Sequence, residues 1–167
     1  MALTPGQILT SYPVPSCNYQ VTVHDGDKNP TISFAEVTGL KREYETVTYK
    51  HGWSFKLGYF IIPGDIKPIH ITMKRGVFVD DEYLDAWFES MDKWVNVFYP
   101  TNNPLRTRDV EIALFNGYGT HAGPTVTWKV RGAIPVKLEA PTFNASSNEV
   151  AIESLELVAK DIEVTYG

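Results

Sequence analysis

Apolar residues recur at every second position in four separate stretches of this chain. The stretches span residues 19–24, 69–74, 109–114 and 126–131. Side chains alternate between the two faces of a β-strand, so a period of two is typical of a strand with one face buried. Residues 44–49 alternate as well, in residue types that suit a pleated surface. The repetition of this pattern predicts a mainly β fold.

One segment has a helical period instead. Its apolar residues are Leu84, Trp87, Phe88, Met91, Trp94 and Val95. This spacing gives a continuous stripe along one face of a helix. Asp80 is a suitable N-cap, and Asp81 and Glu82 place negative charge where the helix dipole favours it. We therefore expect one amphipathic helix over about residues 80–95, with its tryptophans in the core.

The chain is predicted to be a single domain preceded by an arm. Residues 1–16 hold three of the eleven prolines, which remove backbone donors and favour extended conformations. Residues 17–167 contain no linker, repeat or low-complexity tract, and their number suits one domain. Many strands and one helix predict two packed antiparallel sheets, in a β-sandwich or partial barrel, with the helix covering an open end or face.

The last strands contain a change of parity. Val150 and Ile152 share one face, whereas Leu155 and Leu157 lie at the opposite parity. One extra residue in a strand exchanges its faces, so the change predicts a β-bulge near Ser154.

Charge, cysteine content and hydropathy exclude several classes of protein. The net charge of −5 and the isoelectric point near 5.3 argue against binding of a phosphate backbone over the outer surface. Cys17 is the only cysteine, which excludes an intrachain disulfide and a cysteine zinc site. The N-terminal residues lack a basic start followed by an apolar run, so we expect no secretory signal. No apolar stretch is long enough to predict a membrane span.

No catalytic, cofactor or metal site is predicted. The four histidines, His24, His51, His70 and His121, are scattered without the close spacing of metal ligands. The glycine-rich residues 117–123 lack the Gly-Lys-Ser/Thr ending of a phosphate loop, and a strand pattern follows them. The sequence therefore gives no reason to expect an enzyme.

An aromatic segment at residues 49–63 is harder to assign. Its large apolar residues are Tyr49, Trp53, Phe55, Leu57, Tyr59, Phe60, Ile61 and Ile62, interrupted by Gly52, Gly58 and Pro63. The segment is either a buried excursion over the core or an exposed apolar surface that a partner subunit covers.

Several motifs resemble one protein family in order and spacing. Residues 34–40 (FAEVTGL) resemble the "VSGL" strand and turn of contractile tail tube proteins, and residues 71–76 (ITMKRG) resemble their "LTLKRG" segment. Residues 128–137 (WKVRGAIPVK) resemble a "W.L..A.P.K" strand pair, and residues 148–157 (NEVAIESLEL) resemble the closing "N.VAIESLEL" signature. The chain thus resembles the phage tail tube family, which includes inner tube proteins of contractile injection systems and of contractile phage tails of the T4 type.

This resemblance implies a structural role. Six copies would close a shared β-barrel ring around a lumen, and rings would stack into a hollow tube that sheath contraction drives through a target envelope. The implied partners are further copies, a sheath protein outside, baseplate, spike, terminator and cap proteins at the ends, and cargo or a tape-measure protein in the lumen. DNA would be a partner only in a phage tail. Such a phage tail-like particle is expected to assemble in the bacterial cytoplasm.

The resemblance also suggests roles for particular residues. It favours subunit or ring-stacking contacts for Trp53, Phe55, Tyr59 and Phe60. It makes Glu149 and Glu153, in the acidic C-terminal strands, candidates for the lumen surface.

Two alternatives remain open. A tube-initiating baseplate ring or a tail terminator would have the same fold but stop at one ring. A carbohydrate-binding β-sandwich would remain a monomer with an exposed aromatic platform.

Overall fold

The structure is a computed structural model that describes residues 13–26, 28–52, 58–78, 82–95, 107–116, 123–146 and 148–167. Its elements are β1 (Tyr19–His24), β2 (Thr31–Ile32), β3 (Glu36–Thr38), β4 (Tyr44–Tyr49), β5 (Phe60–Ile66), β6 (Ile69–Gly76), α3 (Tyr83–Val95), β7 (Arg108–Leu114), β8 (Val126–Glu139), β9 (Ile152–Ala159) and β10 (Asp161–Tyr166). The mainly β fold is confirmed, and α3 is the one helix among the residues that the structure describes. The predicted arm lies mostly outside the described residues, and its boundary at residue 16 stays a prediction.

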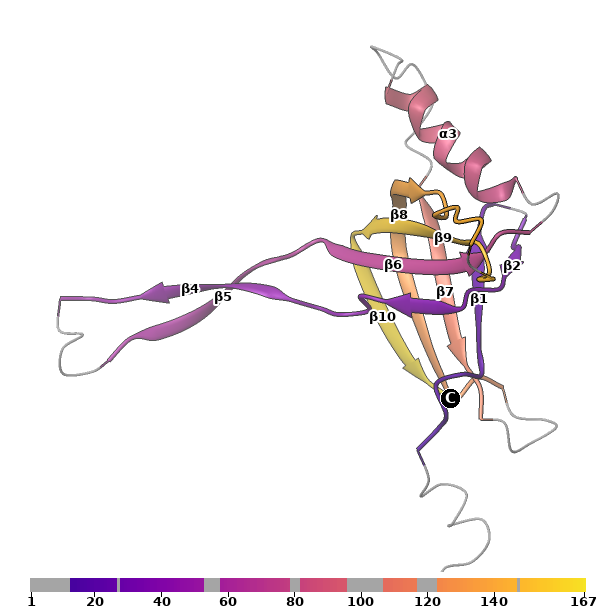
Figure 1. The fold of residues 1–167 in the computed structure, drawn as a ribbon. Coiled ribbons are helices and arrows are strands. Elements are labelled where there is room, and N and C mark those ends of the chain that lie inside the picture. The colour runs from indigo at the N-terminus through magenta and orange to yellow at the C-terminus, as the bar shows by residue number, and fades with distance from the viewer. Residues whose placement is uncertain are drawn as a thin grey trace, which may run out of the picture.

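Strand β8 joins the two layers of the body. Eight strands form one antiparallel sheet in the order β2-β1-β7-β8-β9-β6-β3, with β10 also on β8. The first half of β8, residues 126–131, pairs with β10, and residues 134–139 pair with β9. The chain bends between these halves at Gly132, whose φ of 63° favours glycine. As Figure 1 shows, β3, β6 and β9 consequently cross over the layer of β1, β7, β8 and β10, which gives the predicted two-layer packing.

The core lies between the layers. Its members alternate along the strands and are at most 3% exposed: Val21, Val23, Ile69, Ile71, Met73, Val110, Ile112, Val130, Leu155 and Leu157. The four stretches of alternating apolar residues therefore bury side chains in the core, whereas the alternating residues 44–49 are exposed throughout.

Helix α3 closes one end of the body. It begins at Tyr83, slightly later than predicted, and buries Leu84 and Trp87. The guanidinium carbon of Arg108 lies 4.9 Å from the ring centres of both Tyr83 and Trp87. Its Nη2 is 2.8 Å from Oδ2 of Asp25. The buried cation thus links the helix to β7 and to the turn after β1.

No helix in the described residues is long and apolar enough to cross a membrane.

The predicted bulge near Ser154 is wrong. The register of β6 on β9 runs without interruption from the Ile69–Ala159 pair to the Gly76–Ile152 pair. The irregularity lies on β8, between Pro135 and Lys137. Val150 precedes β9 and is 76% exposed, and Ile152 is 48% exposed on the outer face. The change of parity therefore reflects exposed apolar residues, not an exchange of faces.

Candidate subunit interface

A two-stranded hairpin extends away from the body (Figure 1). It consists of β4 and β5, which pair antiparallel with each other and form a sheet of their own. Every residue of β4 is exposed, and so is every residue of β5 except Gly64. The described part of the hairpin therefore packs on no core of its own chain.

Large apolar side chains lie on both faces of the hairpin. Directly paired residues share a face, so Val47 with Ile62 and Tyr49 with Phe60 form the first face. The second face carries Thr48 with Ile61, Thr46 with Pro63, and, beyond a bulge, Tyr44 with Ile66. Tyr59 has the parity of Ile61, and the Lys50 ammonium lies 6.0 Å from its ring centre. Among the large apolar residues of the hairpin, the exposed fraction ranges from 48% for Ile62 to 62% for Ile61.

This distribution does not suit a hairpin that remains in water. An isolated two-stranded hairpin is marginally stable at best, and antiparallel strands with one solvated face normally alternate apolar with polar residues. Large contiguous apolar surfaces on soluble proteins mark interaction sites. The hairpin is therefore the candidate interface of this chain.

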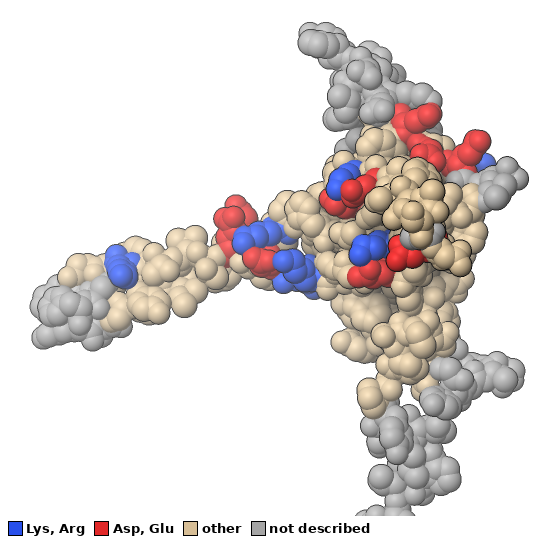
Figure 2. Space-filling model, viewed as in Figure 1, with Lys and Arg blue, Asp and Glu red and all other residues tan. Residues whose placement is uncertain are grey.

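Charged side chains gather where the hairpin joins the body, as Figure 2 shows. Glu43 accepts hydrogen bonds from Lys67, at 2.6 Å, and from Lys41, at 3.2 Å, and Arg42 lies 3.5 Å from Asp161 on β10. The hydrogen bond from Lys67, followed by that from Lys41, lowers the pKa of Glu43, and Glu43 in turn raises the pKa of Lys67. All of these side chains are exposed, so each pair contributes little to the stability of the fold.

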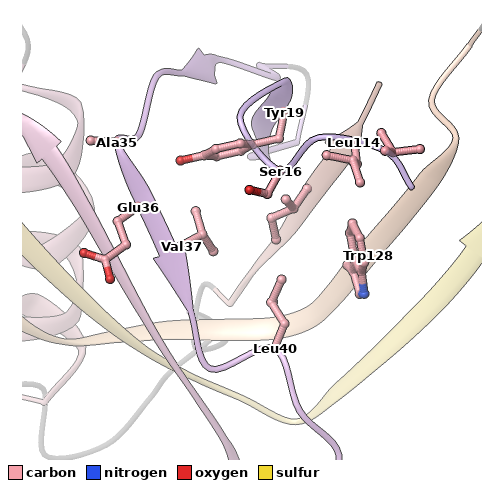
Figure 3. Close-up of a pocket in the computed structure, with 10 residues that line it drawn as sticks. Ser16, Tyr19, Ala35, Glu36, Val37, Leu40, Leu114 and Trp128 are labelled. Atoms are coloured by element: carbon pink, nitrogen blue, oxygen red, sulfur yellow. The ribbon is translucent and has the colours of Figure 1, made fainter. Parts of the chain in front are cut away.

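A pocket of about 340 Å³ opens between β1, β3, β7 and β8. Figure 3 shows its apolar lining, which includes Val37, Leu40, Leu114 and Trp128. The hydroxyl of Tyr19 donates a 2.6 Å hydrogen bond to the carbonyl of Phe34. Partial burial, with a smaller effect of Glu36, raises the pKa of Tyr19 above its ordinary value of 10.0. The pocket is lined mainly by apolar side chains of the body strands and resembles an open end of the core.

Two of the four predicted contact residues fall in the described part. Tyr59 and Phe60 are 59% and 54% exposed on opposite faces of the hairpin. Trp53 and Phe55 lie outside the described residues. Their role as subunit contacts stays a prediction, as it does for Tyr59 and Phe60. The prediction did not include Tyr44, Val47 and Ile66, although the strand pattern at 44–49 contained the first two.

The two lumen candidates lie in different surroundings. Glu149 is exposed in the segment before β9. Glu153 has the parity of Leu155 and Leu157, and its carboxylate pairs with Nε of Arg75 directly opposite on β6. The side chains of Glu153 and Arg75 are only 14% and 3% exposed. Glu153 therefore serves an internal ion pair, and its place in a lumen, like that of Glu149, stays a prediction.

The described residues contain no obvious centre for chemistry. No group of three His, Cys, Asp or Glu side chains in that part is placed to hold a metal ion. His24 hydrogen-bonds Asn29 at 3.0 Å and lies 3.4 Å from Glu111, on a polar sheet face. A projecting hairpin with large exposed apolar side chains is instead typical of a surface that binds another protein.

Comparisons with known proteins show the family to which the chain belongs. The family model described as "T4-like virus tail tube protein gp19" matches residues 15–163. The chain therefore belongs to this family of tail tube proteins. A search of curated proteins found no significant match.

Solved structures of contractile injection systems are similar over nearly the whole chain. A chain of the PVC extracellular contractile injection system, from its sheath–tube complex in the extended state, is 30% identical with a TM-score of 0.77, covering 99% of this chain and 100% of that one. A chain of the PVC sheath/tube terminator is 31% identical with a TM-score of 0.73, covering 93% and 98%. A chain of the anti-feeding prophage tube-terminating cap is 29% identical with a TM-score of 0.70, covering 94% and 93%. The protein is thus a tail tube protein of the contractile injection type.

Proposed function

We propose that this chain is the inner tube subunit of a contractile injection particle, in which rings of six copies stack into a hollow tube inside a sheath. The observation that carries the proposal is the projecting hairpin, whose large apolar side chains are about half exposed on both faces. In a tube, the proteins that would cover this apolar surface are further copies of the same chain. The family and its structural neighbours contain tail components, which supports a structural role over a catalytic one or a sugar-binding module.

The edges of the body suit ring closure. Within the described residues β10 pairs only with β8, and β1 pairs on its outer side with just two residues of β2. These strands lie at opposite ends of one layer, and unpaired strand edges invite pairing with another chain. Pairing of the β10 edge of one copy with the β1 edge of the next is a head-to-tail contact, which closes into a ring when the rotation fits.

The other partners follow from this place in the particle. A sheath would surround the tube, baseplate and spike proteins would begin it, and a terminator or cap would end it. Cargo would occupy the lumen, where Glu149 is the better of the two candidates because Glu153 is held by Arg75. Assembly in the bacterial cytoplasm fits a chain with a single, unpaired cysteine.

A terminator or initiator ring is the second candidate. Similarity at 31% and 29% identity to chains from the terminator and cap structures supports it almost as well as the chain from the sheath–tube complex supports the first. A tube subunit adds ring upon ring, whereas a terminator stops after one.

Assembly of the purified chain tests the proposal. Size-exclusion chromatography with light scattering and negative-stain microscopy are expected to show rings and tubes at micromolar concentration. Single rings that do not lengthen would support the terminator, and a stable 18.8 kDa monomer would contradict both candidates.

A further inference from the structure

Helix α3 is attached to the body by a small contact. Among the helix residues whose side chains are described, 83–91, only Leu84 and Trp87 are buried, whereas Phe88 and Met91 are partly exposed. Figure 1 shows that the helix lies at one end of the body, outside both layers. The attachment therefore depends on the contact around Leu84 and Trp87.

A cation lies at the centre of this contact. The Arg108 side chain is 8% exposed, lies between the rings of Tyr83 and Trp87, and pairs with Asp25 at 2.8 Å. Nε and Nη1 of Arg108 and Nε1 of Trp87 are buried without an acceptor among the described residues. A buried donor without an acceptor destabilises the state that buries it, because water would satisfy the donor once it is exposed. The docked position of α3 thus leaves three donors unsatisfied that an undocked position would hydrate.

Undocking of the helix breaks no strand pairing. The ladders of β1 on β7 and of β7 on β8 are made between the strands themselves. Asp25 is fixed independently of α3, because its backbone exchanges two hydrogen bonds with Lys28 in the turn after β1. The Arg108–Asp25 pair is also within reach of water, since the Asp25 side chain is 26% exposed. Elements that bury few apolar side chains are the ones that open locally in folded proteins.

We propose that α3 is a lid that opens and closes over the end of the core while the sheets stay intact, and that the Arg108–Asp25 pair is the latch that keeps it closed. The open state uncovers Leu84, Trp87 and the apolar end of the core, which gives the subunit a second conformation. This inference concerns a single copy of the chain and does not rest on the proposed function.

Hydrogen exchange followed by mass spectrometry tests the lid on the full chain. Amides of α3 are expected to exchange at least about tenfold faster than those of β7 and β8. Asp25→Asn removes the charge of the latch and should accelerate exchange in α3 by about tenfold to a hundredfold, the effect of losing a hydrogen bond between charged groups, with β6 and β9 unchanged. Glu163→Gln is the matched control, because it breaks the exposed pair with Arg131 on the sheet and should leave α3 unchanged.

A second background tests the latch itself. Arg108→Met replaces the cation by an apolar side chain of similar length, so Asp25→Asn should have no further effect on α3 in that background. Circular dichroism and light scattering verify that all variants have the fold and the assembly state of the wild type. Protection of α3 equal to that of β8 in the wild type would overturn the lid, and so would an equal acceleration of α3 and the strands by Asp25→Asn. The same acceleration of α3 in both backgrounds would overturn the latch.

Discussion

Replacement of Glu153 by glutamine tests whether this carboxylate serves the fold of one copy. Glu153 and Arg75 face each other across β9 and β6, and their side chains are 14% and 3% exposed. Glutamine keeps the shape of glutamate but removes its charge. The Arg75 cation then loses its charged hydrogen bond to Glu153 while remaining away from water.

The size of the effect follows from the burial of the pair. A hydrogen bond to a charged group contributes about 1.5–3 kcal/mol, and breaking a fully buried pair costs about 3–5 kcal/mol. Glu153 keeps some exposure, so we expect Glu153→Gln to lower the free energy of unfolding by about 2–3 kcal/mol. For a chain of this size that corresponds to a fall in Tm of about 4–12 °C.

Urea and thermal unfolding, followed by circular dichroism, measure this change. The measurements use a protein concentration at which light scattering shows monomers of each variant, so that assembly does not contribute to the stability. Glu149→Gln, at an exposed position, is the control and should stay within about 0.5 kcal/mol of its parent. If Glu153→Gln behaves like the control, the internal role of the pair is refuted.

Three further predictions concern the body and the base of the hairpin. Gly39→Ala is expected to lower the free energy of unfolding in urea by more than about 2 kcal/mol, because Gly39 has a φ of 90° and a Cβ there would lie 2.1 Å from a backbone oxygen of β6. Gly52→Ala is the control and should be nearly neutral, since nothing lies within 4 Å of the added Cβ. Trp87→Ala, at a fully buried position, should cost about 3–5 kcal/mol, and a loss below 1 kcal/mol in the same assay would contradict its place in the core. Glu43 has a lowered pKa, so its small contribution to stability is present above its ordinary pKa of 4.5 and is lost as the pH falls through the folded value. Melts of Glu43→Gln and wild type should accordingly differ at neutral pH and converge in acid, and a difference that grows in acid would reverse this sign.

The fate of Glu153 shows what a sequence pattern contains and what it leaves out. Its parity with Leu155 and Leu157 already placed it on the inward face, but the pattern did not show which residue lies opposite. Arg75 is 78 residues away in sequence, and only the β6–β9 register brings the two together. The bulge was misplaced for the same reason, because a register irregularity is a property of a strand pair.

The sequence by itself determined the strands of the body, the helix and the inward residues, since each depends on a local period that burial must satisfy. Alternating apolar residues such as Val21 and Val23, or Ile69, Ile71 and Met73, all point to one face of a strand, and in water that face is buried. Only the tertiary structure showed that the described part of the aromatic segment is exposed and is not buried over the core. A strand that packs on the core of its own chain and a strand that packs on another protein contain the same residue types. Both bury apolar side chains, so the sequence alone does not distinguish them. The tertiary structure shows that β4 and β5 form a separate sheet, project from the body and are exposed on both faces, while the core is complete without them.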